Sequence, residues 1–126
     1  MITLEGELGA GKTTFVRYLL RAMGVQGRIK SPTYAVIESY DLGHHTVSHF
    51  DFYRFRHPQE WEDAGFRDIF AQPGLKVCEW PQKAGGLMPR PDVSLQLQVH
   101  AQGDRQVVVQ ACSPEGLRLL GFLKPA

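Results

Sequence analysis

The chain has 126 residues, of which 43% are hydrophobic and 21% charged, and 14 Lys and Arg against 13 Asp and Glu leave a formal net charge of +1. This composition excludes a disordered or collagen-like chain, and the length predicts one domain over residues 1–126. A near-neutral balance gives no global field for nucleic acid or an anionic membrane. No apolar run reaches the roughly 18 residues of a membrane span and no apolar leader is found, which predicts a soluble cytoplasmic protein.

The chain begins with a strand signal and a helix signal on either side of a glycine-rich turn. Residues 2–4 are a short apolar run. From residue 13 to residue 23, apolar side chains recur at helical spacing, and Gly24 follows where a helix commonly ends. A loop rich in Gly, Lys, Ser and Pro then runs to Pro32.

The middle of the chain predicts two strands and two short helices. Residues 33–40 and 46–53 are β-prone and are separated by a turn. Residues 58–70 open with Pro at a plausible first helical position and carry acids in the first turn, which predicts a helix. Gly65 is expected to divide this segment in two.

The last third predicts a buried strand, a loop and a hairpin. Residues 75–80 form an apolar strand that ends in an acid, and residues 85–91 are expected to be loop. Residues 93–99 alternate strictly between apolar and polar, and residues 107–112 are a second strand after a turn at 102–104.

A final helix is predicted after Ser113, which suits the N-cap position, with Pro114 as the first helical residue. Its apolar side would be formed by Leu117, Leu119, Leu120 and Leu123. The order of elements predicts an α/β fold: a mixed sheet of the P-loop NTPase type, flanked by helices, with a C-terminal β-hairpin and helix.

Residues 6–13 read Gly-Glu-Leu-Gly-Ala-Gly-Lys-Thr and match the phosphate-binding pattern G-x-x-x-x-G-K-[ST] at every fixed position. Gly6, Gly9 and Gly11 let the backbone curl so that successive N–H groups point at phosphate oxygens. Lys12 would reach the β- and γ-phosphates, and the hydroxyl of Thr13 can bind Mg²⁺. The strand before and the amphipathic helix after this loop favour a phosphate site over a chance glycine-rich turn.

The nucleotide and its metal are indicated by a few further residues. The chain has neither the N-K-x-D element nor the D-x-x-G switch of GTPases, which favours ATP. Mg²⁺ needs further oxygen ligands, and Asp51 and Glu79 both follow buried strands where such carboxylates are found. Pro32 stiffens the loop before Thr33, whose hydroxyl either faces the γ-phosphate as a switch residue or belongs to an ordinary turn.

The sequence resembles the bacterial TsaE (YjeE) family of small ATPases from residue 1 to about residue 112. A Leu-x-Pro segment at residues 87–89 also fits that family. The resemblance lies in four motifs, in the same order and at similar separations: residues 6–15, 30–34 (Lys-Ser-Pro-Thr-Tyr), 49–54 (His-Phe-Asp-Phe-Tyr-Arg) and 79–81 (Glu-Trp-Pro).

This resemblance implies a role in making N6-threonylcarbamoyladenosine in certain tRNAs. The implied activity is ATP binding and hydrolysis with Mg²⁺ while docked on the TsaD–TsaB pair. The chain would not itself be the transferase, would meet tRNA only through that complex, and would have no membrane partner.

The resemblance also implies roles for individual residues. The phosphates would be held by Gly6, Gly9, Ala10, Gly11, Lys12, Thr13 and Thr14. Mg²⁺ would lie between Thr13 and Glu79, and Thr33 belongs to a switch-like loop. Lys12, Thr33 and Asp51 would act in catalysis, Asp51 either near the metal or orienting water.

Three positions leave alternatives open. Relatives usually carry a segment before the first strand that contributes to the adenine pocket, whereas this chain starts its first strand at Met1, so the segment is expected to be absent or the start misplaced. Arg105 either contacts the nucleotide, as a nearby Arg does in some relatives, or is a solvated charge of the hairpin. Trp80 is either part of the site or a core aromatic.

Two other function classes are weighed against the ATPase. A small-molecule kinase would use residues 41–72 as a lid that carries Arg54, Arg56 and Arg67. A nucleotide-dependent binding module would need no hydrolysis.

The remaining reactive or charged groups are given a structural interpretation. Cys78 and Cys112 lie in apolar runs and are expected to be buried thiols, the alternative being one disulfide. The basic residues near the first helix form either a solvated face or a local surface for RNA, and they are Arg17, Arg21, Arg28 and Lys30.

Overall fold

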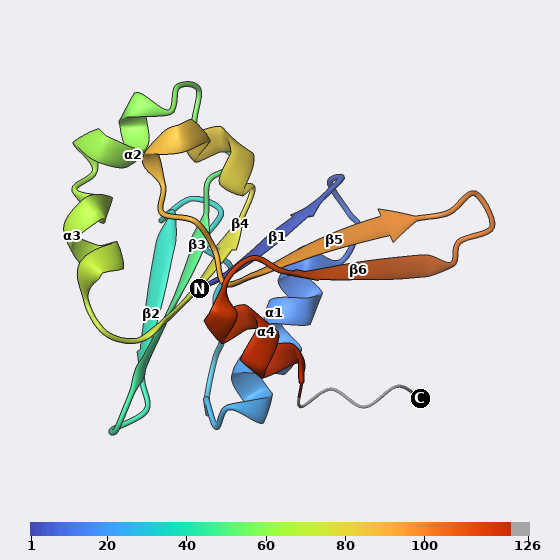
Figure 1. The fold of residues 1–126 in the computed structure, drawn as a ribbon, viewed down its shortest axis with the longest axis horizontal. Helices are drawn as coiled ribbons and strands as arrows, with labels where there is room; N and C mark the ends of the chain where they lie inside the picture. Colours follow the sequence, from blue (N-terminus) through green and yellow to red (C-terminus); the bar gives the residue numbers. More distant parts are fainter. Residues whose placement is uncertain (122–126) are drawn as a thin grey trace.

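The structure is a computed structural model and describes residues 1–121 of the chain. Over this range six strands form one sheet in the order β2-β3-β4-β1-β5-β6, with helices on its faces (Figure 1). The strands are β1 (Ile2–Gly6), β2 (Ile37–Asp41), β3 (Thr46–Asp51), β4 (Leu75–Glu79), β5 (Val93–Val99) and β6 (Arg105–Ala111). The helices are α1 (Lys12–Ala22), α2 (Gln59–Asp63), α3 (Phe66–Ala71), the 3₁₀ helix η1 (Pro81–Leu87) and α4 (Pro114–Leu120).

The direction of the strands decides where the functional residues meet. β1 runs parallel to β4 and β5, and β4 runs parallel to β3, whereas the outer strands β2 and β6 are antiparallel to their neighbours. The predicted mixed α/β sheet with a C-terminal hairpin and helix is therefore confirmed. Because the four inner strands share a direction, Gly6, Asp51 and Glu79 lie at one edge of the sheet, as the last residues of β1, β3 and β4.

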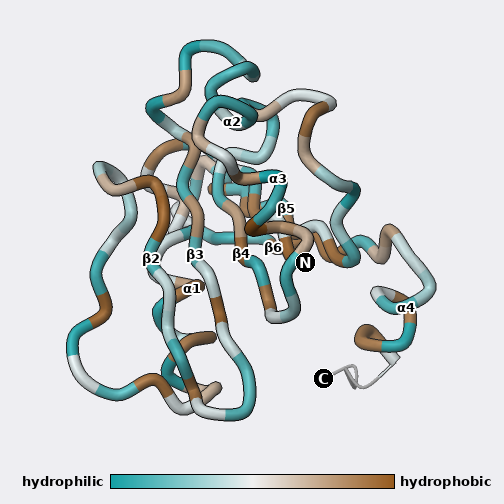
Figure 2. Tube along the Cα trace, turned by 90° about the vertical axis from the view of Figure 1, so that its left-hand side faces the viewer, coloured by the Kyte–Doolittle hydropathy of each residue, from teal (hydrophilic) through white to brown (hydrophobic). Residues whose placement is uncertain are grey.

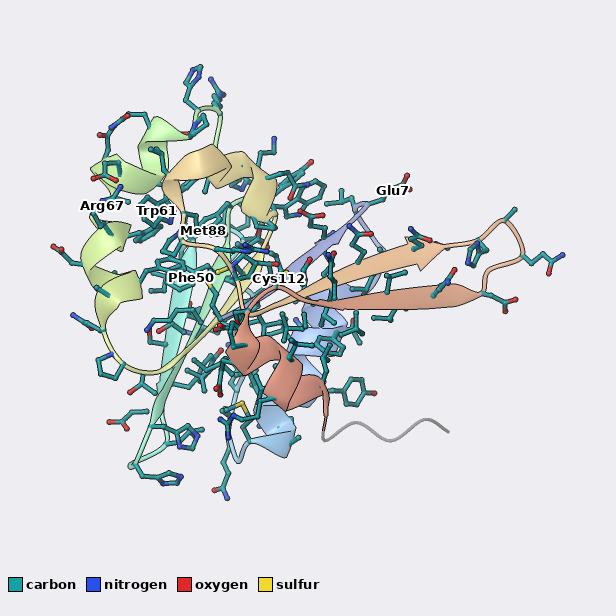
Figure 3. All side chains as sticks on the ribbon, viewed as in Figure 1. Glu7, Phe50, Trp61, Arg67, Met88 and Cys112 are labelled. Carbon is teal, nitrogen blue, oxygen red and sulfur yellow. The ribbon has the colours of Figure 1, made fainter. Side chains whose placement is uncertain are left out.

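The two faces of the sheet pack against different kinds of side chain. On the face covered by α1 the buried cluster is aliphatic and includes Leu4 and Val16. On the opposite face α2, α3 and η1 enclose an aromatic cluster with Phe50, Trp61 and Phe66, and the rings of Phe50 and Phe66 meet edge to face at 5.3 Å between centroids. Figure 3 shows Phe50 and Trp61 between the sheet and these helices, and Figure 2 shows hydrophobic residues along the inner strands.

Helix α1 ends where the sequence predicts. Gly24 has a φ of 104°, which glycine adopts without steric cost, and its N–H donates to the carbonyl of Arg21. The N–H of Val25 donates to the carbonyl of Leu20, which completes a Schellman motif. Gly65, with a φ of 76°, separates α2 from α3 as predicted.

The prediction of a strand over residues 33–40 is wrong in its first half, because β2 begins only at Ile37. Residues 33–36 form a turn in which the N–H of Val36 donates to the carbonyl of Pro32 at 2.7 Å, and Val36 has a φ of 72°. β3 likewise ends at Asp51 rather than at residue 53. The carboxylate of Asp51 accepts a hydrogen bond from the N–H of Tyr53, which turns the chain away from the sheet.

The C-terminal part differs from prediction only in detail. Residues 81–87 form η1 where loop was expected from residue 85, and β6 starts at Arg105, two residues earlier than predicted. Helix α4 is capped as predicted, since the hydroxyl of Ser113 accepts a hydrogen bond from the N–H of Gly116 at 3.0 Å. Leu123, placed by the sequence on the apolar side of this helix, lies outside the described residues.

Cys78 and Cys112 are both free thiols. Cys78 is buried, and burial raises the pKa of its thiol, whereas Cys112 is only half-buried, because it follows the edge strand β6. None of the helices in residues 1–121 has the length and apolar character required to cross a membrane.

Candidate active site

A cavity of about 410 Å³ opens at the edge of the sheet where β1, β3 and β4 end. Its floor is the loop between β1 and α1, with Leu8, Gly9 and residues 11–14. Six side chains from distant parts of the sequence complete the lining: Thr33, Asp51, Tyr53, Glu79, Trp80 and Arg105. The sequence motif and the separately predicted acids therefore share one cavity.

The glycines of the loop are required by its geometry. Gly9 and Gly11 have φ values of 82° and 102°, in the left-handed region that other residues rarely adopt. A Cβ on Gly6 would lie 2.7 Å from the carbonyl oxygen of Leu97, so only glycine lets β1 pass this close to β5. Ala10 lies within the same loop with its side chain buried and does not line the cavity.

Lys12 lies within the loop that it helps to form. Its ammonium donates hydrogen bonds to the carbonyl of Gly6 at 2.5 Å and of Glu7 at 2.9 Å. The ammonium also lies 4.4 Å from the ring centroid of Trp80, in a cation–π contact. Burial lowers the pKa of Lys12, and the charges of Glu79 and Asp51 oppose that shift.

Glu79 connects the loop to the neighbouring strand. Its carboxylate accepts a hydrogen bond from the hydroxyl of Thr13, with oxygen–oxygen distances of 3.0 and 3.2 Å. The second partner is Nε2 of His49, 2.6 Å from Oε2 of Glu79, and the two side chains are only 1% and 2% exposed. A carboxylate buried this deeply is stabilised by such donors.

Asp51 is the register partner of Glu79 across β3 and β4. Burial raises the pKa of Asp51 and the charge of Glu79 adds to the rise, while the N–H of Tyr53 and the charges of His49 and Lys12 oppose it. Two buried carboxylates thus lie side by side at the mouth of the loop. Such paired acids near a lysine are typical of sites that handle cations or activate water.

These residues fit Mg²⁺ only in combination with a nucleotide. No three His, Cys, Asp or Glu side chains within residues 1–121 are grouped so as to hold a metal ion by themselves. The hydroxyl of Thr13 and the carboxylate of Glu79 are the oxygen donors that Mg²⁺ prefers, and Mg²⁺ commonly completes its coordination with phosphates and water.

Thr33 and Arg105 are far apart in the sequence, and both line the cavity. Thr33 lines the cavity, and its hydroxyl lies 2.8 Å from that of Ser31. Arg105 is exposed, but its guanidinium Nη1 lies 3.0 Å from the place that a Cβ of Gly11 would take. The structure therefore brings the side chains of Lys12, Thr13, Thr14, Thr33, Asp51, Glu79 and Arg105 together with the glycine loop.

Sequence reasoning missed the place of His49 and Tyr53. His49 and Tyr53 belong to the 49–54 motif. His49 precedes Asp51 by two residues, so the alternation of β3 directs the side chains of His49 and Asp51 toward the same face of the sheet. That spacing was the available signal.

The lid required by a kinase is not observed in residues 41–72. This segment contains the end of β2 followed by β3, α2 and α3, and its Phe and Trp side chains pack in the aromatic cluster. Arg67 is bound to Glu62, with a shortest distance of 2.8 Å, and Arg54 lies over the ring of Tyr34 at 4.1 Å. Arg67, labelled in Figure 3, lies on the helical side of the molecule beside Trp61.

Several known proteins are similar to this chain in sequence. The profile of the family described as "Threonylcarbamoyl adenosine biosynthesis protein TsaE" matches residues 1–107. A Haemophilus influenzae protein named tRNA threonylcarbamoyladenosine biosynthesis protein TsaE is 43% identical over 93 residues, which cover 74% of this chain and 59% of that protein. Proteins of the same name from Treponema pallidum and Bacillus subtilis are 34% and 31% identical, over 86% and 88% of this chain and 80% and 69% of their own lengths.

The fold is shared with a solved structure of lower sequence similarity. A crystal structure of YdiB from Bacillus subtilis superposes with a TM-score of 0.79 over 95% of this chain and 73% of that chain, at 24% identity, which shows a shared fold. The chain spans 59% of the length of its Haemophilus influenzae relative. Since the family profile matches residues 1–107 of 126, the chain belongs to the TsaE family.

Proposed function

We propose that this chain binds ATP with Mg²⁺ in the cavity above the loop at residues 6–13 and hydrolyses it in support of tRNA threonylcarbamoyladenosine biosynthesis. The names of its relatives support the pathway. The observation that carries the activity is the meeting of Lys12, Thr13, Asp51 and Glu79 in one cavity, at the N-terminus of α1.

The residues of the loop account for the grip on the phosphates. Its backbone N–H groups and the positive end of the 11-residue helix α1 attract the anion. Lys12 adds a full positive charge and exchanges carbonyl partners for phosphate oxygens. Bound Mg²⁺, held by Thr13 and Glu79, would neutralise the charge that develops on the phosphates.

Asp51 and Thr33 are the residues proposed to act on the attacking water and the terminal phosphate. Asp51 is buried and lines the cavity, so its carboxylate can accept a hydrogen bond from a water molecule there. Thr33 offers a hydroxyl in the same cavity. Positioning of this kind is the main contribution that a protein makes to phosphoryl transfer.

We further propose that the partner is the TsaD–TsaB pair and that it stimulates a slow intrinsic ATPase in the cytoplasm. The TsaE family assignment supports this choice of partner. tRNA would then be met through the complex rather than by direct contact.

The proposal is tested by calorimetry and by product analysis. We expect MgATP to bind the isolated chain and inorganic phosphate to appear slowly with ATP alone, faster once TsaD–TsaB is added. Absence of Mg²⁺-dependent ATP binding by folded protein contradicts the site, and phosphate transfer that depends on a small-molecule acceptor favours a kinase. Rapid turnover that partners leave unchanged contradicts the proposed stimulation.

A further inference from the structure

His49 occupies a position where an apolar side chain would serve the fold better. It lies on β3 opposite Val77 of β4, and Val47, two residues earlier on the same strand face, is fully buried in the aliphatic cluster. His49 is itself 1% exposed. Burying an imidazole among such neighbours is unfavourable unless its nitrogen atoms find partners.

Only one of the two ring nitrogens has a partner among residues 1–121. Nε2 lies 2.6 Å from Oε2 of Glu79, while Nδ1 is buried and makes no hydrogen bond. A carboxylate oxygen can only accept, so Nε2 carries the proton in this bond. Among residues 1–121, the hydrogen bonding of the His49 side chain is therefore directed at Glu79 alone.

Within residues 1–121, the carboxylate of Glu79 has one side-chain hydrogen-bond donor besides His49, the hydroxyl of Thr13. Thr13 donates to Glu79 from the loop, and its hydroxyl is also the group expected to bind Mg²⁺. When Thr13 turns to the cation, His49 is the donor that stays with Glu79. The ring is buried on one face of the sheet, so it fixes the orientation of the carboxylate more firmly than a flexible surface residue would.

We propose that His49 is a positioning residue: it anchors Oε2 of Glu79 so that the carboxylate is preset for the Mg²⁺ that accompanies the nucleotide. This inference rests on the proposed function. It assigns His49 no contact with phosphate or water, only with Glu79.

The test compares two replacements that differ in a single property. His49→Gln retains an N–H donor, whereas His49→Leu has similar bulk and no donor. His100→Leu is the matched control, because His100 is exposed and its Nε2 contacts only Gln106, at 2.9 Å. Calorimetry gives the Kd of the β,γ-imido analogue of ATP in EDTA and at increasing Mg²⁺. The Kd in EDTA divided by the Kd at saturating Mg²⁺ measures the coupling to the cation.

We expect His49→Leu to reduce this ratio about tenfold, as loss of a residue that orients a metal ligand commonly does, with the Kd in EDTA changed less than about twofold. His49→Gln should restore most of the ratio, and His100→Leu should match the unmodified protein. In a Glu79→Gln background, His49→Leu should have no further effect, because it acts through Glu79.

An unchanged ratio in His49→Leu overturns the role of His49 while leaving the proposed function intact. If Mg²⁺ does not change the Kd of the analogue for the unmodified protein, the proposed metal site itself is overturned. Should His49→Leu fail to fold, ¹⁵N-histidine NMR of the unmodified protein decides: the Nε2–H resonance of His49 should shift when Mg²⁺ joins the bound analogue, and its indifference refutes the proposal.

Discussion

Two buried lysines make the same kind of local contact in two regions of the molecule. Lys12, the first residue of α1, contacts the loop before that helix, and Lys76, within β4, contacts the turn before that strand. Lys12 donates to the carbonyls of Gly6 and Glu7, and Lys76 donates to those of Gln72 and Gly74. They are 5% and 7% exposed, and burial lowers the pKa of both ammonium groups.

The difference between them lies in what surrounds the ammonium. Lys12 lines a cavity, faces the ring of Trp80, and is influenced by the charges of Glu79 and Asp51. Lys76 does not line that cavity, and its pKa is lowered mainly by burial, with Cys78 opposing the shift. A lysine held by carbonyls is therefore not a phosphate site by itself, since the acids and the open space beside Lys12 are what distinguish it.

The largest effect expected from this comparison is on nucleotide affinity. Lys12→Met should weaken MgATP binding about 100-fold, because it removes a charge-assisted hydrogen bond to phosphate worth roughly 1.5–3 kcal/mol. Lys76→Met removes an equally buried charge and should change the Kd less than about twofold. Calorimetry on the two variants checks this, and comparable losses in both would mean that the effect is one of folding.

Ligand-induced stabilisation should separate the two lysines in the same sense. Nucleotide at 100 times its Kd raises the unfolding free energy by about 2.7 kcal/mol through mass action. Thermal melts with and without MgATP should show this gain in the unmodified protein and in Lys76→Met. Lys12→Met should lose most of it at the same concentration, and a full gain in that variant would contradict the assignment of Lys12.

Asp51→Asn tests the acids beside Lys12 through the pH dependence of the unfolding free energy. Burial raises the pKa of Asp51 above its ordinary 3.8, so the folded protein binds this proton more tightly than the unfolded chain does. The unfolding free energy therefore falls as the pH rises from that ordinary value through the raised one. Without nucleotide, the gain in stability from Asp51→Asn should be larger at pH 7 than at pH 4 in urea unfolding. An equal gain at both values would show that Asp51 has an ordinary pKa.

The sequence predicted the regions whose structure is set locally. The glycine pattern of the loop, Gly24 after α1 and the alternation of residues 93–99 each specify their own conformation, and each is found where expected. The turn at residues 33–36 was missed because Val36 adopts a positive φ against its own preference. Long-range contacts hold it there, including the hydrogen bond from the N–H of Asp51 to its carbonyl.

The same distinction applies to the candidate site. Asp51 and Glu79 were identified because each ends a strand, which is a local signal. The contact between His49 and Glu79 joins residues 30 positions apart and depends on the register between β3 and β4, which no periodicity reports. In this fold, contacts that depend on the register between strands could not be predicted from the sequence.

The smallest expected effect is an alkaline one, and it tests whether the two lysines remain equivalent before ligand binds. Since burial lowers the pKa of Lys12 and Lys76, the unfolded chain binds more protons than the folded protein between each lowered pKa and the ordinary 10.5. Stability contributed by these groups therefore rises with pH across that window. Tyr40, whose pKa burial raises, acts in the opposite sense, so each lysine is isolated by subtracting the curve of its methionine variant from that of the unmodified protein.

Without nucleotide, the difference in unfolding free energy between the unmodified protein and each methionine variant should change with pH in the same direction for Lys12 and Lys76. With saturating nucleotide, phosphate stabilises the charged form of Lys12, so its difference should flatten or reverse while that of Lys76 persists. Urea unfolding between pH 8 and about pH 10.5 supplies the measurement. A difference for Lys12 that nucleotide leaves untouched would mean that its ammonium stays with the carbonyls of Gly6 and Glu7, and the two lysines would then be structural alike.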